Sequence, residues 1–162
     1  MAMEVIAWLI ALPLLGTVTG LRTFTPLTVL CWFAWTRALP LDDTWAFWAA
    51  KLPVAILFTV LAVCELVADK QPWIPDRTRP FSVATKLVLG GLLGAIVATG
   101  LNGAAIEGII LSVLGVLVGT YGGFLIRRDL VQKANCQDWQ VAVTEDAVAV
   151  VCAVVAMAVV SS

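Results

Sequence analysis

The stretch "AAIEGIILSVLGVLVGTYGGFLI", residues 104–126, decides the fold class of this chain. It contains a single charged residue, Glu107. A helix crosses the hydrocarbon of a membrane with about 20 apolar residues, so this stretch is long enough to do so. A membrane interior offers no water to backbone N–H and C=O groups, which leaves a helix as the form such a segment can take. The stretch therefore predicts a transmembrane helix.

One face of this predicted helix is made of small residues. They follow one another at steps of three or four, which places them on one side of a helix; they are Gly108, Ser112, Gly115, Gly119 and Gly122. A neighbouring apolar stretch carries Gly90 and Gly94 at the same spacing. Small residues let helix backbones approach closely in lipid. We interpret both faces as helix-packing surfaces, with a dimer seam or a smooth pore wall as the alternatives.

The composition of the whole chain agrees with a membrane protein. Of its 162 residues, 61% are hydrophobic and 13% are charged, and the mean hydropathy is +0.99. Soluble domains carry about 25% charged residues. We predict an all-α, polytopic helix bundle that forms a single transmembrane domain, residues 1–162, with the lipid bilayer as its partner. A net charge of −1 without a basic stripe speaks against nucleic acid.

Six apolar segments follow one another along the chain. They cover residues 3–20, 23–37, 45–66, 81–101, 104–126 and 141–160. The second is short and contains Pro26, so it is either a full span or a re-entrant half-helix. Six spans also allow two halves of opposite orientation, 1–80 and 81–162, which is the inverted 3+3 repeat of many transporters.

Basic residues gather on one side of this arrangement. They are Arg22, Lys70, Arg77, Arg79, Lys86, Arg127, Arg128 and Lys133. Loops rich in Lys and Arg stay in the cytoplasm. We therefore expect this side to be cytoplasmic and both termini to face outward.

Histidine is absent, and the four cysteines show no Cys-x-x-Cys spacing. Without histidine, the chain lacks the commonest general base and a common metal ligand. Isolated cysteines in apolar runs usually act as small hydrophobic residues. We expect no enzyme and no cofactor, and we leave open whether a metal ion binds.

Carboxylates are predicted near the cytoplasmic ends of the helices. They are Glu65, Asp69, Glu145 and Asp146, and Arg22 lies at the same level. Ionisable groups in a membrane segment cost about 2.5–3.5 kcal/mol each on insertion scales, so they turn into the bundle and pair. In one interpretation these residues form an acidic site for a cation or for protons. In the other they are helix-end residues, and an Arg22–Glu65 salt bridge sets the packing.

The start of the second segment joins this candidate pathway. Thr23 and Thr25 lie beside Pro26. A proline frees backbone carbonyls in a membrane helix, and hydroxyls can re-satisfy them or line a polar path. Discontinuous helices of this kind build transporter sites, and a packed kink is the alternative.

Motifs in a fixed order suggest a family. They are "GLRTFTPL" from residue 20, "ELVADKQPWIPDRTRP" from residue 65, "GTYGGFLIRRDLV" from residue 119 and "TEDAVAV" from residue 144. Together they resemble the small bacterial integral membrane proteins classed as domain of unknown function 4126, over nearly the whole chain. The resemblance implies a protein of the bacterial inner membrane and supplies no catalytic residues.

The expected function is that of a small transporter or channel. Its polar acidic site would lie near the cytoplasmic helix ends, with a cation or a proton-coupled solute as the favoured substrate. A chain of this length offers little room for a pathway, so we expect a homo-oligomer, with a dimer favoured. The alternative is a non-catalytic membrane scaffold or assembly factor that binds partners through its cytoplasmic loops.

Overall fold

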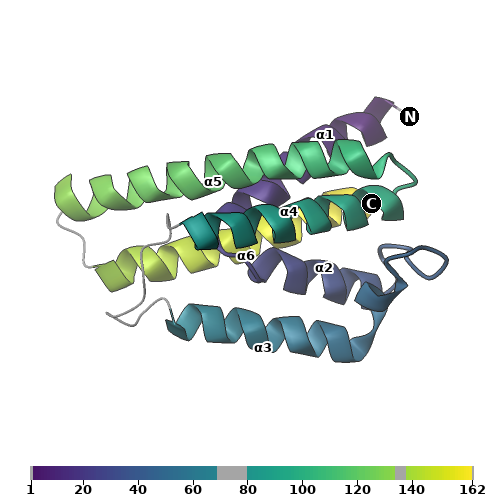
Figure 1. Cartoon of the computed structure of the whole chain (residues 1–162), viewed down its shortest axis with the longest axis horizontal. Helices are drawn as coiled ribbons and strands as arrows, with labels where there is room; N and C mark the ends of the chain where they lie inside the picture. The colour runs from purple at the N-terminus through teal and green to yellow at the C-terminus, as the bar shows by residue number, and fades with distance from the viewer. Residues whose placement is uncertain (1, 69–79, 134–137, 162) are drawn as a thin grey trace.

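The computed structural model of the chain is all-helical (Figure 1). It describes the backbone of residues 2–68, 80–133 and 138–161, and the side chains of 8–68, 80–130 and 140–161. The α-helices of these ranges are α1 (Ala2–Leu21), α2 (Thr25–Trp35), α3 (Leu52–Ala68), α4 (Pro80–Gly100), α5 (Ala105–Lys133) and α6 (Asp138–Ser161), and η1 (Phe47–Ala50) is a short 3₁₀ helix. The all-α prediction is confirmed. Three helices, α4, α5 and α6, are long and apolar enough to cross a membrane.

The two largest differences between the helix boundaries and the predicted segments are at the start of α3 and at the end of α5. The third helix begins at Leu52 rather than at residue 45, because Pro53 favours the first turn of a helix and η1 takes up the apolar residues before it. The fifth helix runs past residue 126 to Lys133. Its polar extension is rich in Arg, Leu, Gln and Lys, which are good helix formers, so the helix outlasts the apolar stretch.

The helices run side by side, and both termini lie at one end of the bundle (Figure 1). α1 enters from that end, and α2 turns back toward it. α1 packs against α5, α6 and α4, whereas α2 packs between α3 and α6. α3 packs almost entirely against α2 and η1, so it is the peripheral helix of the bundle.

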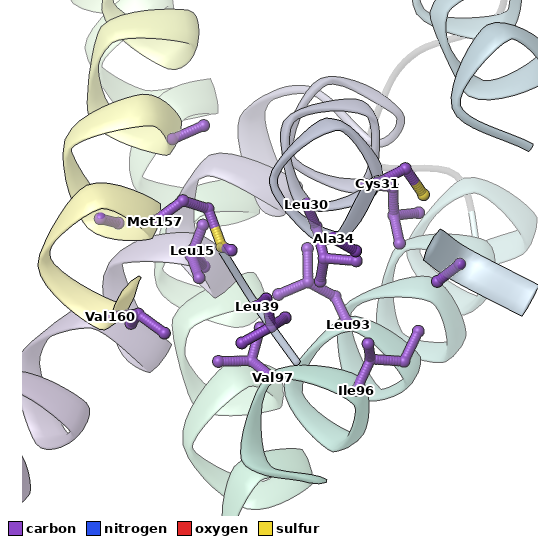
Figure 2. Close-up of a cluster of buried hydrophobic side chains, with 14 of the residues drawn as sticks. Leu15, Leu30, Cys31, Ala34, Leu39, Leu93, Ile96, Val97, Met157 and Val160 are labelled. Atoms are coloured by element: carbon purple, nitrogen blue, oxygen red, sulfur yellow. The ribbon is translucent and has the colours of Figure 1, made fainter. Parts of the chain in front are cut away.

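The hydrophobic core lies between α1, α2, α4 and α6 (Figure 2). Leu15, Leu30 and Val97 come from three of these helices and are fully buried. Leu39 and Leu41, from the loop after α2, are also buried, and Leu39 packs close to Gly100 at the end of α4. The loop therefore closes the core at the end of the bundle that carries the termini.

The outer surface of the bundle is apolar. Large hydrophobic side chains are exposed along α3, α5 and α6, among them Ile56, Val60, Ile110, Val118, Val151 and Val155. Contiguous apolar surface of this kind is rare on a soluble monomer. Such a surface suits lipid, which agrees with three helices long enough to span a bilayer.

The two halves of the chain are not alike in helix length. In a three-plus-three repeat α2 would correspond to α5, but α2 has 11 residues and α5 has 29. At about 1.5 Å per residue, α2 is about 16 Å long, roughly half the thickness of the hydrocarbon core of a bilayer. The short second segment is thus a half-length helix that begins inside the bundle.

Candidate functional site at the break between α1 and α2

The chain breaks between α1 and α2 at residues 22–24. The backbone N–H of Arg22 still donates to the carbonyl oxygen of Val18, at 2.7 Å. Pro26 lies in the first turn of α2, where it lacks an N–H group and its ring would clash with the carbonyl four residues earlier. Pro26 thus favours a break at this point, and the N–H groups of Thr23 and Phe24 bond outside both helices.

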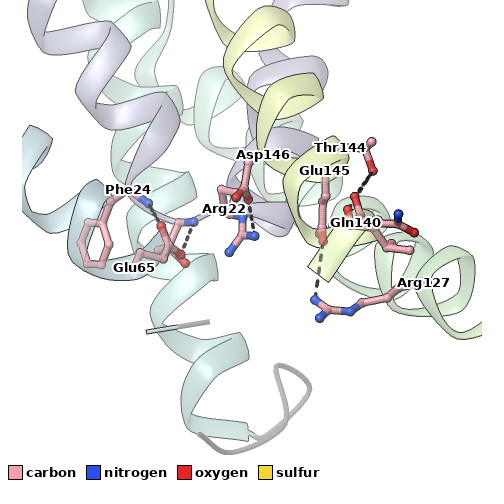
Figure 3. A network of polar contacts seen from close by, with 10 residues as sticks. Arg22, Phe24, Glu65, Arg127, Gln140, Thr144, Glu145 and Asp146 are labelled. Atoms are coloured by element: carbon pink, nitrogen blue, oxygen red, sulfur yellow. Dashed lines mark hydrogen bonds and ion pairs between the residues drawn. The ribbon is translucent and has the colours of Figure 1, made fainter. Parts of the chain in front are cut away.

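Glu65 of α3 accepts hydrogen bonds from these two N–H groups (Figure 3). Thr23 N donates to Oε1 at 2.8 Å, and Phe24 N donates to Oε2 at 2.9 Å. Both carboxylate oxygens are therefore engaged by the backbone just ahead of α2. A negative charge is favourable there, because the N-terminus of a helix carries a partial positive charge. Glu65 closes one side of the break.

The other side of the break is closed from α4 and α5. Lys86 Nζ donates to the carbonyl oxygen of Gly20 at 2.8 Å, and Thr120 Oγ1 donates to the same oxygen at 3.4 Å. Gly20 lies in the last turn of α1, where the helix dipole favours a positive charge. Both side chains are buried. The sequence reasoning used Lys86 only for orientation; the signal that it missed is a lone lysine inside a span.

Arg22 connects the break to α6. Its side chain is 1% exposed and forms an ion pair with Asp146, whose side chain is 16% exposed. Of the two interpretations, the structural one had Arg22 paired with Glu65; among the described side chains Arg22 pairs with Asp146 instead, and Glu65 accepts backbone N–H groups. Breaking a buried ion pair is costly, since it leaves one charge without its partner in a low dielectric. The pair therefore fixes the break against α6.

The remaining predicted site residues do not all lie at the break. Glu145 pairs with Arg127 of α5 at 3.7 Å and lies beside Gly123, on the far side of Arg22 from Glu65 in Figure 3. Thr23 and Thr25 are both buried at the break. Asp69 lies outside the described residues.

The break lies within the span of the neighbouring helices. Lys86 is about 14 residues before the end of α4 at Gly100, and Asp146 is about 15 residues before the end of α6 at Ser161. At 1.5 Å per residue both lie about 21–22 Å from the end of the bundle that holds the termini. The hydrocarbon core of a bilayer is about 30 Å thick. If those helix ends lie at its boundary, the break is inside the membrane.

The carboxylates that the structure describes do not form a metal-binding cluster. Within the described residues, no three Cys, Asp or Glu side chains come together to hold a metal ion. Ca²⁺ takes six to eight oxygen ligands and Mg²⁺ needs an octahedral set. Here the oxygens of Glu65 already accept two N–H groups, and Asp146 is bound to Arg22. The carboxylates described at the break therefore do not provide the oxygen set that a divalent cation needs.

The predicted small-residue faces pack α5 against α1 and α4. A methyl group at Gly119 would overlap the carbonyl oxygen of Thr17, one at Gly115 that of Pro13, and one at Gly94 that of Gly108. Gly108 and Gly90 also face a neighbouring helix, and Ser112 Oγ donates to Gly90 O at 2.7 Å. We call these backbone-to-backbone contacts of α1, α4 and α5 the glycine seam.

Two details of the seam differ from the prediction. A Cβ atom at Gly122 would meet nothing within 4 Å, so Gly122 takes no part in packing α5 against the other described helices, and a dimer seam at Gly122 stays a prediction. Gly16 and Gly20 of α1, in contrast, lie against the backbone of Ser112 and Val116. Sequence reasoning missed these two, although their Gly-x-x-x-Gly spacing is the signal for close helix packing.

The chain matches the family described as "Domain of unknown function (DUF4126)" over residues 9–160. The chain belongs to the DUF4126 family. This confirms the resemblance seen in the sequence motifs. Neither the curated proteins nor the solved structures compared with the chain gave a match.

The motifs by which the chain resembles the DUF4126 family meet at the break. "GLRTFTPL" contains Arg22 and Thr23, and "ELVADKQPWIPDRTRP" begins with Glu65. "GTYGGFLIRRDLV" supplies Thr120 and Arg127, and "TEDAVAV" supplies the two acidic residues of α6, Glu145 and Asp146. Segments far apart in the sequence thus converge on one place in the DUF4126 fold.

Proposed function

We propose that the chain is a small multi-pass membrane transporter or channel whose pathway passes the break between α1 and α2. The observation that carries the proposal is Glu65, a carboxylate within the bundle that is held by two backbone N–H groups of a half-length helix. A helix end and several ionisable groups inside a span are both costly in lipid. A protein that only anchors partners has no use for a helix end and charged groups inside the membrane, whereas a transport pathway requires polar groups there.

The favoured substrate is a small solute that moves together with a proton. Proton exchange needs a single carboxylate, whereas a divalent cation needs six or more oxygen ligands, which the described carboxylates do not bring together. Buried carboxylates in membrane segments serve as proton relays in pumps and transporters. The proposal includes no catalytic chemistry.

The membrane arrangement belongs to the same proposal. Six helices lie in the bacterial inner membrane, with α2 entering only half of it, and the basic loops after α3 and α5 face the cytoplasm. The break then lies near the cytoplasmic ends of the helices. Two copies form a dimer, and an inverted relation of residues 1–80 and 81–162 stays a prediction.

Vesicles containing the purified protein test the proposal. The vesicles hold the pH-sensitive dye pyranine, and salts of monovalent and divalent cations, amino acids and short carboxylic acids are added outside one at a time. We expect at least one of them to change the internal pH with the wild type and not with Glu65→Gln. Glu107→Gln is the matched control, because Glu107 is exposed in the first turn of α5. No response to any solute, or an equal response of Glu65→Gln, would contradict the proposal.

The alternative function is a membrane scaffold that binds partners through its cytoplasmic loops. It has one observation in its favour: Glu65, Lys86 and Asp146 each contact another group of the protein, as structural residues do. The loops themselves, 69–79 and 134–137, lie outside the described residues. Under this alternative Glu65→Gln weakens folding and changes no flux, so the same vesicle experiment separates the two functions.

A further inference from the structure

The attachment of α3 to the rest of the bundle is uneven along its length. At its start, Ala55 is fully buried, and the preceding η1 buries Ala49. The loop before η1 is held to α4, where Trp45 Nε1 donates to Thr99 Oγ1 at 3.0 Å. The η1 end of α3 is therefore joined to the core through a packed and hydrogen-bonded loop.

The middle of α3 is hydrogen-bonded to α2. Thr28 Oγ1 donates to Phe58 O at 2.8 Å, and Trp32 Nε1 donates to Thr59 Oγ1 at 3.0 Å. Beyond these bonds, Ala62 is the last buried residue, and Val63 and Val67 are more than half exposed. Leu61 and Leu66 are half-buried, so this half of α3 packs much as the first half does around Ala55. The two ends of α3 therefore differ in their polar contacts rather than in buried apolar area.

The last turn of α3 is held by Glu65. Its carboxylate bonds to Thr23 and Phe24, which continue directly from α1 and Arg22. These are the polar bonds that join this end of α3 to the break among the described residues. α1 is itself fixed, because the glycine seam sets its backbone against that of α5. One carboxylate thus couples the end of α3 to a rigid helix.

We propose that α3 is a gate beside the break, which pivots at its η1 end and is held closed by the carboxylate of Glu65. When Glu65 releases Thr23 and Phe24, the end of α3 near Cys64 swings away from the bundle. The N–H groups of both residues then become accessible at the start of α2. Motions of this kind need a hinge at one end and a breakable contact at the other. The inference rests on the proposed function only for what the opening is for, because the motion itself is inferred from the polar contacts at the two ends of α3.

Distances between spin labels test the gate without measuring any flux. One label is placed on Cys64, which is exposed at the moving end, and the other on Val118→Cys of α5, where Val118 is 65% exposed. The control pair joins Val118→Cys to Ile56→Cys at the η1 end of α3, with Cys64→Ser. Cys31, Cys136 and Cys152 are replaced by alanine in both pairs. The protein is held in lipid nanodiscs with an excess of unlabelled chain, so that distances between copies do not contribute.

The expected result is a change at one end of α3 only. A hydrogen bond to a charged group is worth about a factor of ten or more in an equilibrium constant, so Glu65→Gln should raise the open population about tenfold. The Cys64 pair then shows a broader distribution with a longer second distance, while the Ile56 pair stays narrow. The narrow control also shows that the variant is folded.

Two outcomes overturn the gate. If both pairs stay narrow in Glu65→Gln, the carboxylate does not hold the end of α3. If both pairs broaden equally, α3 detaches as a whole and has no pivot. Neither outcome decides whether the protein transports a solute, so the gate and the proposed function can fail separately.

Discussion

The glycine seam and the break both hold α1, but they use different interactions. In the seam, Gly16 of α1 lies directly on the backbone of Ser112 of α5, without room for a methyl group. At the break, a few residues further along, the same helix ends against Lys86, and the next residue, Arg22, pairs with Asp146. The seam depends on shape, whereas the break depends on charge.

This difference separates a fixed part of the molecule from an exchangeable one. Closely packed backbones lose their contacts as soon as they move apart, because dispersion attraction falls off within an ångström. Charged groups can exchange partners, take up a proton or follow a moving helix. We therefore assign rigidity to the seam and function to the break, and three substitutions can test that assignment.

The largest effect is expected at the buried ion pair. Asp146→Ala leaves Arg22 without this carboxylate, and we expect the free energy of unfolding to fall by about 3–5 kcal/mol. Asp129→Ala is the control, because Asp129 is 48% exposed beside Arg128 and a surface pair contributes about 0–1 kcal/mol. Unfolding in mixed detergent micelles measures both. Equal losses of unfolding free energy would show that the ion pair at the break contributes no more than a surface ion pair.

The next effect is expected in the seam. Gly119→Ala forces a methyl group onto the carbonyl of Thr17, so we expect a loss of about 1–3 kcal/mol. Gly122→Ala adds the same atom in open space and should stabilise the helix by up to about 1 kcal/mol, because alanine is the better helix former. The same unfolding experiment compares the two variants. A stable Gly119→Ala variant would mean that the seam is loosely packed.

The smallest effect is expected from the hydrogen bond in the seam. Ser112→Ala removes the bond from Ser112 Oγ to Gly90 O, and such bonds between membrane helices contribute about 0.6 kcal/mol on average. Unfolding of this variant beside Gly119→Ala ranks the two contributions. A loss from Ser112→Ala as large as that from Gly119→Ala would show that hydrogen bonding, rather than backbone proximity, holds the seam.

Much of the fold could be predicted because a membrane helix is determined by the short segment that forms it. A run of apolar residues such as 104–126 must form a helix in lipid, whatever it packs against. Residues spaced by three or four share a helix face, so the small faces of α4 and α5 were visible in the sequence. The short second segment was also open to prediction, because Pro26 favours a break or kink in a helix that would otherwise continue from the first segment.

The sequence predicted which residues belong to the candidate site but not which of them pair with one another. Ionisable residues inside apolar segments are rare and costly, which singled out Glu65, Glu145 and Asp146. Their partners lie on other helices, and helix rotation decides which of several charges at one level meet. Several carboxylates were expected at the level of Arg22, and the sequence does not say which of them faces it.

The sequence by itself determined that this chain is an all-helical membrane protein of the DUF4126 family, because hydropathy, periodicity and motifs are properties of short segments. The tertiary structure decided that Arg22 pairs with Asp146 and that Glu65 holds the start of α2. It also decided that α1, rather than α4 alone, completes the seam with α5. These facts depend on how helices distant in sequence are rotated and placed against one another, and that information lies in the packing of the whole bundle.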